Sequence, residues 1–161
     1  MIVSVRQTIL GAITISECDG ALTNLYFEHY AVPEDAEPGE SEVIREAFRQ
    51  LLAYLGGKLR VFDLPLSPLG TPFMQEVWHH VAGVSFGRTA TYRDIAAAIG
   101  NPRAVRAVGM ANHRNPLPLF IPCHRIIGSD GSLTGYRGGL QLKRRLLAME
   151  RLSCASDFVG H

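Results

Sequence analysis

The spacing of apolar residues changes along the chain and predicts strands first and helices later. In residues 9–27, apolar side chains alternate with small or polar ones on both sides of Asp19-Gly20, which predicts a β-hairpin with a tight turn. In residues 42–55, apolar side chains recur at three- and four-residue intervals, which is typical of an amphipathic helix ended by Gly56-Gly57. Residues 59–64 then have the pattern of a short strand.

Beyond residue 70 the pattern becomes mainly helical. Thr71 is a suitable helix cap and Pro72 a suitable first helical residue, and Val77 and Val81 follow at helical spacing. We expect Trp78, in the same helix, to lie in the core rather than in a functional site.

Two short helices follow, joined by a glycine-containing turn. Thr91 caps the first, with Asp94 in the capping-box position, and the turn at residues 100–102 leads into a second helix over residues 103–113. This arrangement is typical of a helix-turn-helix. Many helical hairpins of this kind bind nothing, so the pattern alone does not establish nucleic-acid binding.

The segment 65–70, rich in proline and glycine, is the best candidate for a domain linker in the 161-residue chain. We therefore expect an α/β (α+β) protein with two domains. Residues 1–65 form a small sheet-plus-helix domain, and residues 66–152 form a mostly helical domain with a helix-turn-helix, winged-helix-like in character. The second domain ends with a helix over residues 140–151, and residues 153–161 form a loose tail.

Charge is distributed unevenly between the two halves. Residues 1–65 carry ten acidic and five basic side chains, whereas residues 66–161 carry five acidic and eleven basic ones. A basic half beside an acidic one indicates contact with a polyanion on one side only, although solvated surface charge gives the same imbalance.

Three cysteines, Cys18, Cys123 and Cys154, form neither a CxxC pair nor an even disulfide set. This favours a reducing, cytoplasmic compartment over secretion. The first residues lack the features of a signal peptide, and no apolar run is long enough to span a bilayer. We expect a soluble cytoplasmic protein without a membrane partner.

Cys123 lies in the stretch 121–125, between a proline and His124. Pro116, Pro118 and Pro122 predict a rigid, non-helical connector that holds the thiol in one place. A histidine and an arginine beside a thiol favour its nucleophilic thiolate form. The alternative is a buried structural cysteine, as most free cysteines are.

The helix predicted at residues 103–113 has an unusual composition for DNA recognition. Ala104, Ala107 and Ala111 form a smooth face, with Arg106 as the one long cation in the middle of the helix. Helices that read the major groove present polar side chains to base edges, whereas an alanine face permits close approach to a minor groove. The same face could instead pack in the core.

Two further features stand near the C-terminus. Residues 135–139 form a glycine-rich loop with one aromatic, Tyr136, and such a loop can lie close to a ligand or simply end a strand. Glu150 stands near the end of the last predicted helix, where an acid is unfavourable against the helix dipole. A local rule broken in this way is sometimes explained by function.

Together these stretches resemble the O6-alkylguanine-DNA alkyltransferases. The resemblance extends without a gap from about residue 70 to residue 150, and the first 65 residues match only in outline. The motifs that carry it are residues 121–125, residues 70–73 with 77–78, residues 101–109, residues 135–140 and residues 146–150.

The resemblance implies direct-reversal DNA repair, in which an alkyl group moves from guanine O6, and from O4-alkylthymine as well, irreversibly onto the protein's own cysteine. Cys123 is the implied nucleophile and His124 the base, directly or through water, with Glu150 orienting and stabilising the imidazole. Asn115 supports the site, and Tyr92 donates a hydrogen bond to the base and helps to neutralise the departing guanine.

The resemblance also implies that the partner is double-stranded DNA, whose damaged base is flipped out of the stack. The helix at residues 103–113 enters the minor groove and Arg106 fills the gap left by the base. The other implied DNA-binding residues are Ala104, Ala107, Ala111 and Asn112, and the implied lining of the guanine pocket is Tyr92, Tyr136 and Arg137. The N-terminal half is implied to be ribonuclease H-like. We expect a monomer without a cofactor, and without a metal because no second cysteine stands near Cys18 at ligand spacing.

Three other functions fit parts of the pattern. A non-catalytic alkylated-base sensor of the same fold carries a different residue at the reactive position, which Cys123 argues against. A methylation-activated transcription factor needs a further metal-bound DNA-binding module that the chain lacks. A thiol hydrolase, suggested by Cys123, His124 and Glu150 alone, turns over repeatedly, whereas an alkyl acceptor reacts once.

Overall fold

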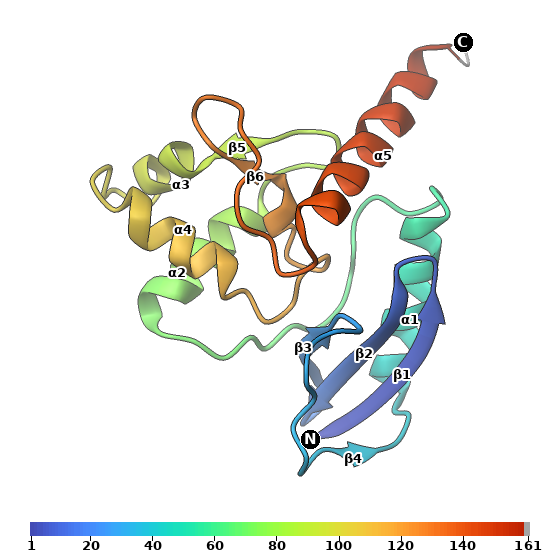
Figure 1. The fold of residues 1–161 in the computed structure, drawn as a ribbon. Coiled ribbons are helices and arrows are strands. Elements are labelled where there is room, and N and C mark those ends of the chain that lie inside the picture. Colours follow the sequence, from blue (N-terminus) through green and yellow to red (C-terminus); the bar gives the residue numbers. More distant parts are fainter. Residues whose placement is uncertain (160–161) are drawn as a thin grey trace. The chain divides into compact units, whose positions relative to one another are not determined.

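The computed structural model describes residues 1–159, and their side chains as far as residue 157. It divides into two compact units, Met1–Leu69 and a second unit that begins at Gly70, so the division falls inside the predicted linker 65–70 (Figure 1). No helix within the described residues combines the length and the apolar character needed to cross a membrane. The α+β class predicted from the sequence is confirmed.

The first unit contains a four-stranded sheet in the order β3-β2-β1-β4. β1 and β2, and β2 and β3, are antiparallel, whereas the two-residue β4 is parallel to β1. The predicted hairpin is confirmed as β2–β3, and its turn places Asp19 and Gly20 at φ of 52° and 82°, as a two-residue hairpin turn requires. The sequence did not predict β1 as a strand. The strands are β1 (Ile2–Thr8), β2 (Gly11–Cys18), β3 (Ala21–Tyr26) and β4 (Glu37–Pro38).

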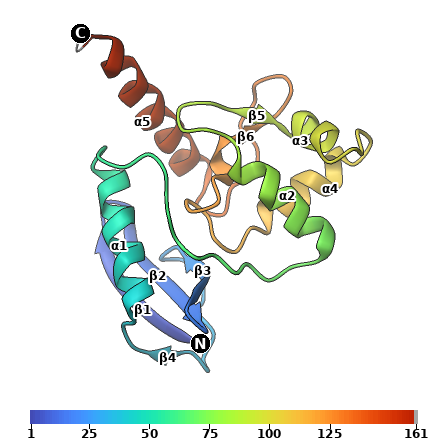
Figure 2. The same cartoon turned by 180° about the vertical axis from the view of Figure 1, so that it is seen from behind.

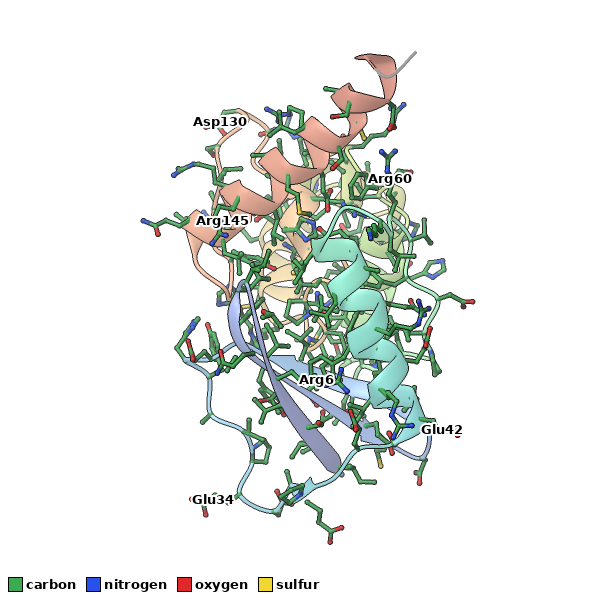
Figure 3. The ribbon with its side chains drawn as sticks, turned by 90° about the vertical axis from the view of Figure 1, so that its right-hand side faces the viewer. Arg6, Glu34, Glu42, Arg60, Asp130 and Arg145 are labelled. Atoms are coloured by element: carbon green, nitrogen blue, oxygen red, sulfur yellow. The ribbon has the colours of Figure 1, made fainter. Side chains whose placement is uncertain are left out.

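One face of this sheet is covered by α1 (Glu42–Leu55), which confirms the helix predicted at residues 42–55 (Figures 1 and 2). Its apolar stripe, including Phe48 and Leu51, is fully buried together with Ile13 and Ile15 of β2. Arg6 extends from β1 toward the helix, where its guanidinium lies 4.7 Å from the centre of the Phe48 ring (Figure 3).

The strand predicted at residues 59–64 is wrong. This segment has no ladder partner, and the Gln50 side chain of α1 takes the place of one. The Gln50 Nε2 donates to the Asp63 carbonyl at 3.0 Å, and the Asp63 N–H donates to Gln50 Oε1 at 2.9 Å. A buried amide thus satisfies an extended segment that pattern alone assigns to a sheet.

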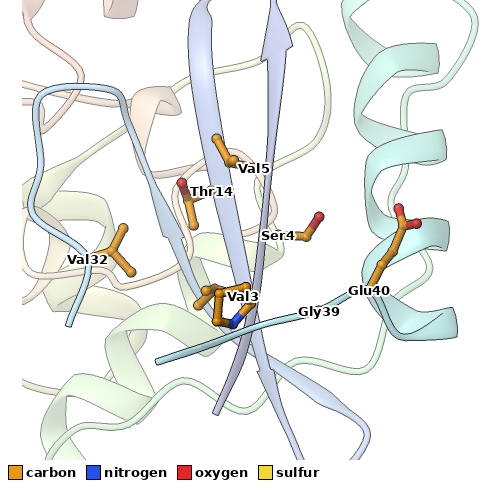
Figure 4. A pocket seen from close by; sticks show the side chains of 8 residues that line it. Val3, Ser4, Val5, Thr14, Val32, Gly39 and Glu40 are labelled. Atoms are coloured by element: carbon orange, nitrogen blue, oxygen red, sulfur yellow. The ribbon is translucent and has the colours of Figure 1, made fainter. Parts of the chain in front are cut away.

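The other face of the sheet carries an apolar pocket of about 580 Å³. Val3, Val5 and Thr14 of the strands line it together with Val32 of the loop before β4 (Figure 4). The two valines are paired across the sheet with Ser16 and Thr14, which places these four side chains on the face opposite α1.

The second unit is built around three packed helices, α2 (Pro72–Ala82), α3 (Tyr92–Ala98) and α4 (Val105–His113) (Figure 2). Thr71 caps α2, and Thr91 and Asp94 form the predicted capping box at the start of α3. The predicted core position of Trp78 is confirmed, since its side chain is 2% exposed and its indole N–H donates to the Ala111 carbonyl at 2.8 Å.

The remaining elements of this unit present the chemically interesting residues. β5 (Ala90–Thr91) and β6 (Ile126–Ile127) form a short parallel pair, and the 3₁₀ turn η1 (Cys123–Arg125) directly precedes β6. The final helix, α5, runs from Leu140 to Val159, so the loose tail predicted from residue 153 is wrong as far as residue 159. Residues 160–161 lie outside the described residues.

Candidate active site

The segment that leads to Cys123 is buried although it is neither helix nor strand from residue 115 to 120. Asn115 closes it with its side chain, because Nδ2 donates to the Ile121 carbonyl at 2.9 Å and Oδ1 accepts from the Leu117 N–H at 3.0 Å. The prolines at 116, 118 and 122 have no N–H to satisfy, which reduces the cost of burying this backbone. Asn115 therefore does support the loop that carries the cysteine.

The backbone tightens as it reaches the cysteine. Pro122 has φ of −80° and ψ of 63°, and the Cys123 N–H donates to the Ile121 carbonyl at 2.7 Å, which together form an inverse γ-turn. One 3₁₀ turn follows over Cys123–Arg125, so the prediction of a wholly non-helical connector is wrong for these three residues. The turn directs the Cys123 side chain inward, where the residue is 5% exposed.

Glu150 of α5 receives hydrogen bonds from three residues of two separate segments, the turn η1 and the loop between α2 and β5. His124 Nε2 lies 2.8 Å from Oε2, and Arg125 donates from Nε to Oε1 at 2.8 Å and from Nη2 to Oε2 at 3.0 Å. The Gly87 N–H reaches Oε1 at 3.3 Å. The Glu150 side chain is 1% exposed. The sequence predicted the pairing of His124 with Glu150, but the roles of Arg125 and Gly87 were not predicted.

The thiol of Cys123 is held in its protonated form in this structure. Burial raises its pKa to about 11, and this effect outweighs a hydrogen bond from the Asn115 side chain and the positive charges of Lys143 and Arg137, all of which act in the opposite direction. A nucleophilic thiolate therefore requires that a proton be removed when substrate is bound.

The imidazole of His124 is suited to removing that proton. Burial lowers its pKa and outweighs the favourable pairing with Glu150, while the charges of Arg125 and Lys143 lower it further. The carboxylate of Glu150 is an acceptor, so Nε2 carries the hydrogen that points at it, and Nδ1 carries the lone pair. Within the described part of the chain, this buried Nδ1 has no hydrogen-bond partner.

Lys143 is a site residue that sequence reasoning missed. It is fully buried, and its ammonium group donates to the carbonyls of Ile126 at 2.7 Å and Thr134 at 2.9 Å. Burial lowers its pKa to about 8, partly offset by its attraction to Cys123. It lies seven residues before Glu150, on the same face of α5, and that spacing was the available signal.

The residues predicted to line a base pocket lie close to Lys143, His124 and Cys123. Tyr92, at the start of α3, accepts a hydrogen bond from Thr134 at 3.0 Å through its hydroxyl, and the Lys143 ammonium lies 6.0 Å from its ring centre. The buried Tyr136 ring meets the His124 ring edge-on, with centroids 6.4 Å apart. Arg137 is half-buried, and its charge acts on the Cys123 thiol. Their role as a guanine pocket stays a prediction.

Helix α4 does not present the alanine face that the sequence predicted. Arg106 and Ala107 are exposed and Ala104 is half-buried, but Ala111 is 1% exposed and packs in the core beneath Trp78. Asn112 is also buried, at 3% exposure, and its Nδ2 donates to the Cys123 carbonyl at 3.3 Å. Ala111 and Asn112 are therefore not on an exposed face of α4, and the Asn112 side chain instead supports the cysteine turn.

Comparisons with known proteins identify the same two parts of the chain. Residues 1–68 match the family described as 6-O-methylguanine DNA methyltransferase, ribonuclease-like domain, and residues 72–152 match its DNA binding domain. A methylated-DNA–protein-cysteine methyltransferase of Methanosarcina barkeri is 45% identical, covering 93% of this chain and 97% of its own length. The constitutive enzyme of that name from Bacillus subtilis is 43% identical, covering 91% and 93%. The crystal structure of Mycobacterium tuberculosis OGT in complex with DNA has a TM-score of 0.89 and 38% identity, covering 95% of this chain and 94% of that one.

The contact of Gly87 with α5 gives a test of the packing that supports Glu150. Gly87 has φ of +79°, and a Cβ built on it would overlap the Cys154 sulfur. We expect Gly87→Ala to lower the free energy of unfolding by about 2–3 kcal/mol, and Cys154→Ala to recover part of that loss. Urea unfolding followed by Trp78 fluorescence measures both.

Gly100→Ala is the matched control, because Gly100 has φ of +78° with no atom near its absent Cβ. It carries the backbone strain alone, at about 1 kcal/mol, and does not respond to Cys154→Ala. Equal costs at the two glycines would contradict the proposed packing.

Proposed function

The chain belongs to the methylated-DNA–protein-cysteine methyltransferase family and is a DNA-repair alkyltransferase, and we propose that Cys123 is the residue that accepts the alkyl group. The resemblance found in the sequence is thereby confirmed. The observation that supports Cys123 is its position directly beside the buried network of His124, Arg125 and Glu150. Cys18 and Cys154 have no such partners in the described residues.

The proposed reaction is a single displacement at the alkyl carbon. The Cys123 sulfur forms a bond to that carbon while the bond from carbon to guanine O6 breaks, and the bonding pair stays with the guanine. The proton lost by the thiol is matched by one gained by the departing base, so the products are a thioether and neutral guanine. A thioether is a stable end product, so each chain acts once. The same displacement applies to O4-alkylthymine.

His124 is the proposed base for the thiol. Its lowered pKa keeps the imidazole neutral, and the unpartnered Nδ1 accepts the proton directly or through a water molecule. Glu150 then stabilises the imidazolium that forms, in the manner of other thiol–imidazole–carboxylate sites. Lys143 stabilises the negative charge on sulfur, since its charge lowers the pKa of this thiol more than that of Arg137 does.

Access to the target atom requires that the damaged base leave the duplex. We propose that α4 enters the minor groove with the exposed side chains of Arg106 and Ala107 and the adjoining Ala104, and that Arg106 occupies the space left by the base. The flipped guanine then stacks between Tyr92, Tyr136 and Arg137, where the Tyr92 hydroxyl donates to the base. One chain acts on one lesion. The sensor alternative is not favoured, because Cys123 is present with its catalytic partners.

Intact-mass measurement after incubation with a duplex containing O6-methylguanine tests the acceptor directly. We expect one methyl group per chain on the wild type, none on Cys123→Ala, and an unchanged adduct on Cys18→Ala and Cys154→Ala. Repeated turnover, or a methyl group on another residue, would rule out Cys123 as the single acceptor.

Comparing duplex and free-base substrates tests Arg106. Arg106→Ala should slow repair of O6-methylguanine in a duplex by about tenfold to a hundredfold, because unstacking a base costs a few kcal/mol. Its reaction with free O6-benzylguanine should be unchanged, since a free base needs no flipping. Equal losses with both substrates would refute a role in base extrusion.

A further inference from the structure

Arg125 makes three side-chain hydrogen bonds within the site and has no role in the displacement described above. All three of its guanidinium nitrogens are engaged within the described structure: Nε and Nη2 donate to Glu150, and Nη1 donates to the Val84 carbonyl at 2.8 Å. Its side chain is 7% exposed. A bidentate contact of this kind fixes both the direction and the ionised state of a carboxylate.

The loop between α2 and β5 holds the other side of this contact. Its Phe86 ring centre lies 5.7 Å from the Arg125 guanidinium carbon, and its Gly87 N–H reaches Glu150 Oε1. Each oxygen of Glu150 therefore receives Arg125 and one further donor, Gly87 at Oε1 and His124 at Oε2. Rotation of the carboxylate would break these bonds at once.

We propose that Arg125 is a positioning residue for alkyl transfer, which holds Glu150 ionised and aimed at His124 and thereby sets the pH at which the imidazole can accept the proton of the thiol. This rests on the proposed function of His124 as the base for Cys123. The hydrogen bonds of Arg125 go to Glu150 and the Val84 carbonyl, so its proposed effect passes through the carboxylate.

The direction of the effect follows from the groups that face His124. Glu150 of α5 raises its pKa, whereas burial, Arg125 and Lys143 lower it, and the edge of the Tyr136 ring is uncharged. Without Arg125 the carboxylate loses its strongest counter-ion and His124 loses a neighbouring positive charge. Both losses favour uptake of one further proton by the coupled His124–Glu150 pair, so the pH above which the pair has a neutral imidazole beside an ionised carboxylate rises, and less of this form is present at neutral pH.

The test is the pH dependence of the reaction with free O6-benzylguanine, which avoids any effect on DNA binding. We expect Arg125→Ala to react about 10–100 times more slowly at pH 7 and to need a pH about one unit higher for half of its maximal rate. Millimolar guanidinium should restore at least a several-fold faster rate, whereas sodium at equal ionic strength should not.

Two further variants keep the test decisive. Arg125→Lys retains the charge but loses the bidentate geometry, so its rate should fall while its half-maximal pH stays near that of the wild type. Arg151→Ala, which removes the exposed arginine next to Glu150 in α5, should match the wild type throughout. If Arg125→Ala does not fold, Arg125→Lys alone still tests the proposal, because a wild-type rate in that variant would overturn it.

A folded Arg125→Ala that reacts slowly with an unshifted pH profile and no rescue by guanidinium would show a structural role only, and would overturn the proposal. Failure of the proposed function is distinguishable, because wild-type protein would then carry no alkyl group on Cys123. In the expected case the wild type is alkylated on Cys123 and only the Arg125 variants shift or slow the reaction.

Discussion

A buried carboxylate determines how this site is built. Glu150 is fully buried in the middle of α5, which continues to Val159, so the helix-end position predicted for it is wrong; an unpaired charge there would cost several kcal/mol. Its donors come from η1 and from Gly87 in the loop before β5, where a Cβ would overlap the Cys154 sulfur. The same pairing that makes the carboxylate tolerable also joins α5 to the turn that carries the cysteine. The contacts that hold α5 against this turn are therefore the same ones that position His124.

The surroundings of the carboxylate explain how a reactive thiol is kept safe in a protein that reacts once. Burial keeps Cys123 protonated, with a pKa of about 11. Little of the nucleophilic thiolate is therefore present to react with electrophiles in solution. Burial also keeps His124 neutral, which leaves it able to act as a base. In our proposal, substrate binding places an alkyl carbon against the Cys123 sulfur. Only then does the thiol proton move to His124. Lys143, buried between two carbonyls, supplies the compensating charge.

The sequence predicted local structure well and long-range contacts poorly. The capping box at Thr91 and the amphipathic stripe of α1 are local signals, and both are confirmed. The strand at residues 59–64 was wrong because a glutamine side chain, distant in sequence, satisfies that backbone in place of a neighbouring strand. Ala111 was placed on a DNA-facing surface because periodicity shows that alanines share a face but not what covers it. Arg125 was visible only as a charge beside a thiol, since its partners lie 41 and 25 residues away.

The protonation state of His124 is the most direct test of this account. Long-range proton–nitrogen correlation spectra of the ¹⁵N-labelled protein report both imidazole nitrogens as the pH is lowered. The account predicts a neutral ring at pH 6.5, where an ordinary imidazole is half protonated, with the hydrogen on Nε2 and none on Nδ1. A doubly protonated ring at that pH, or a neutral ring with its hydrogen on Nδ1, would contradict it.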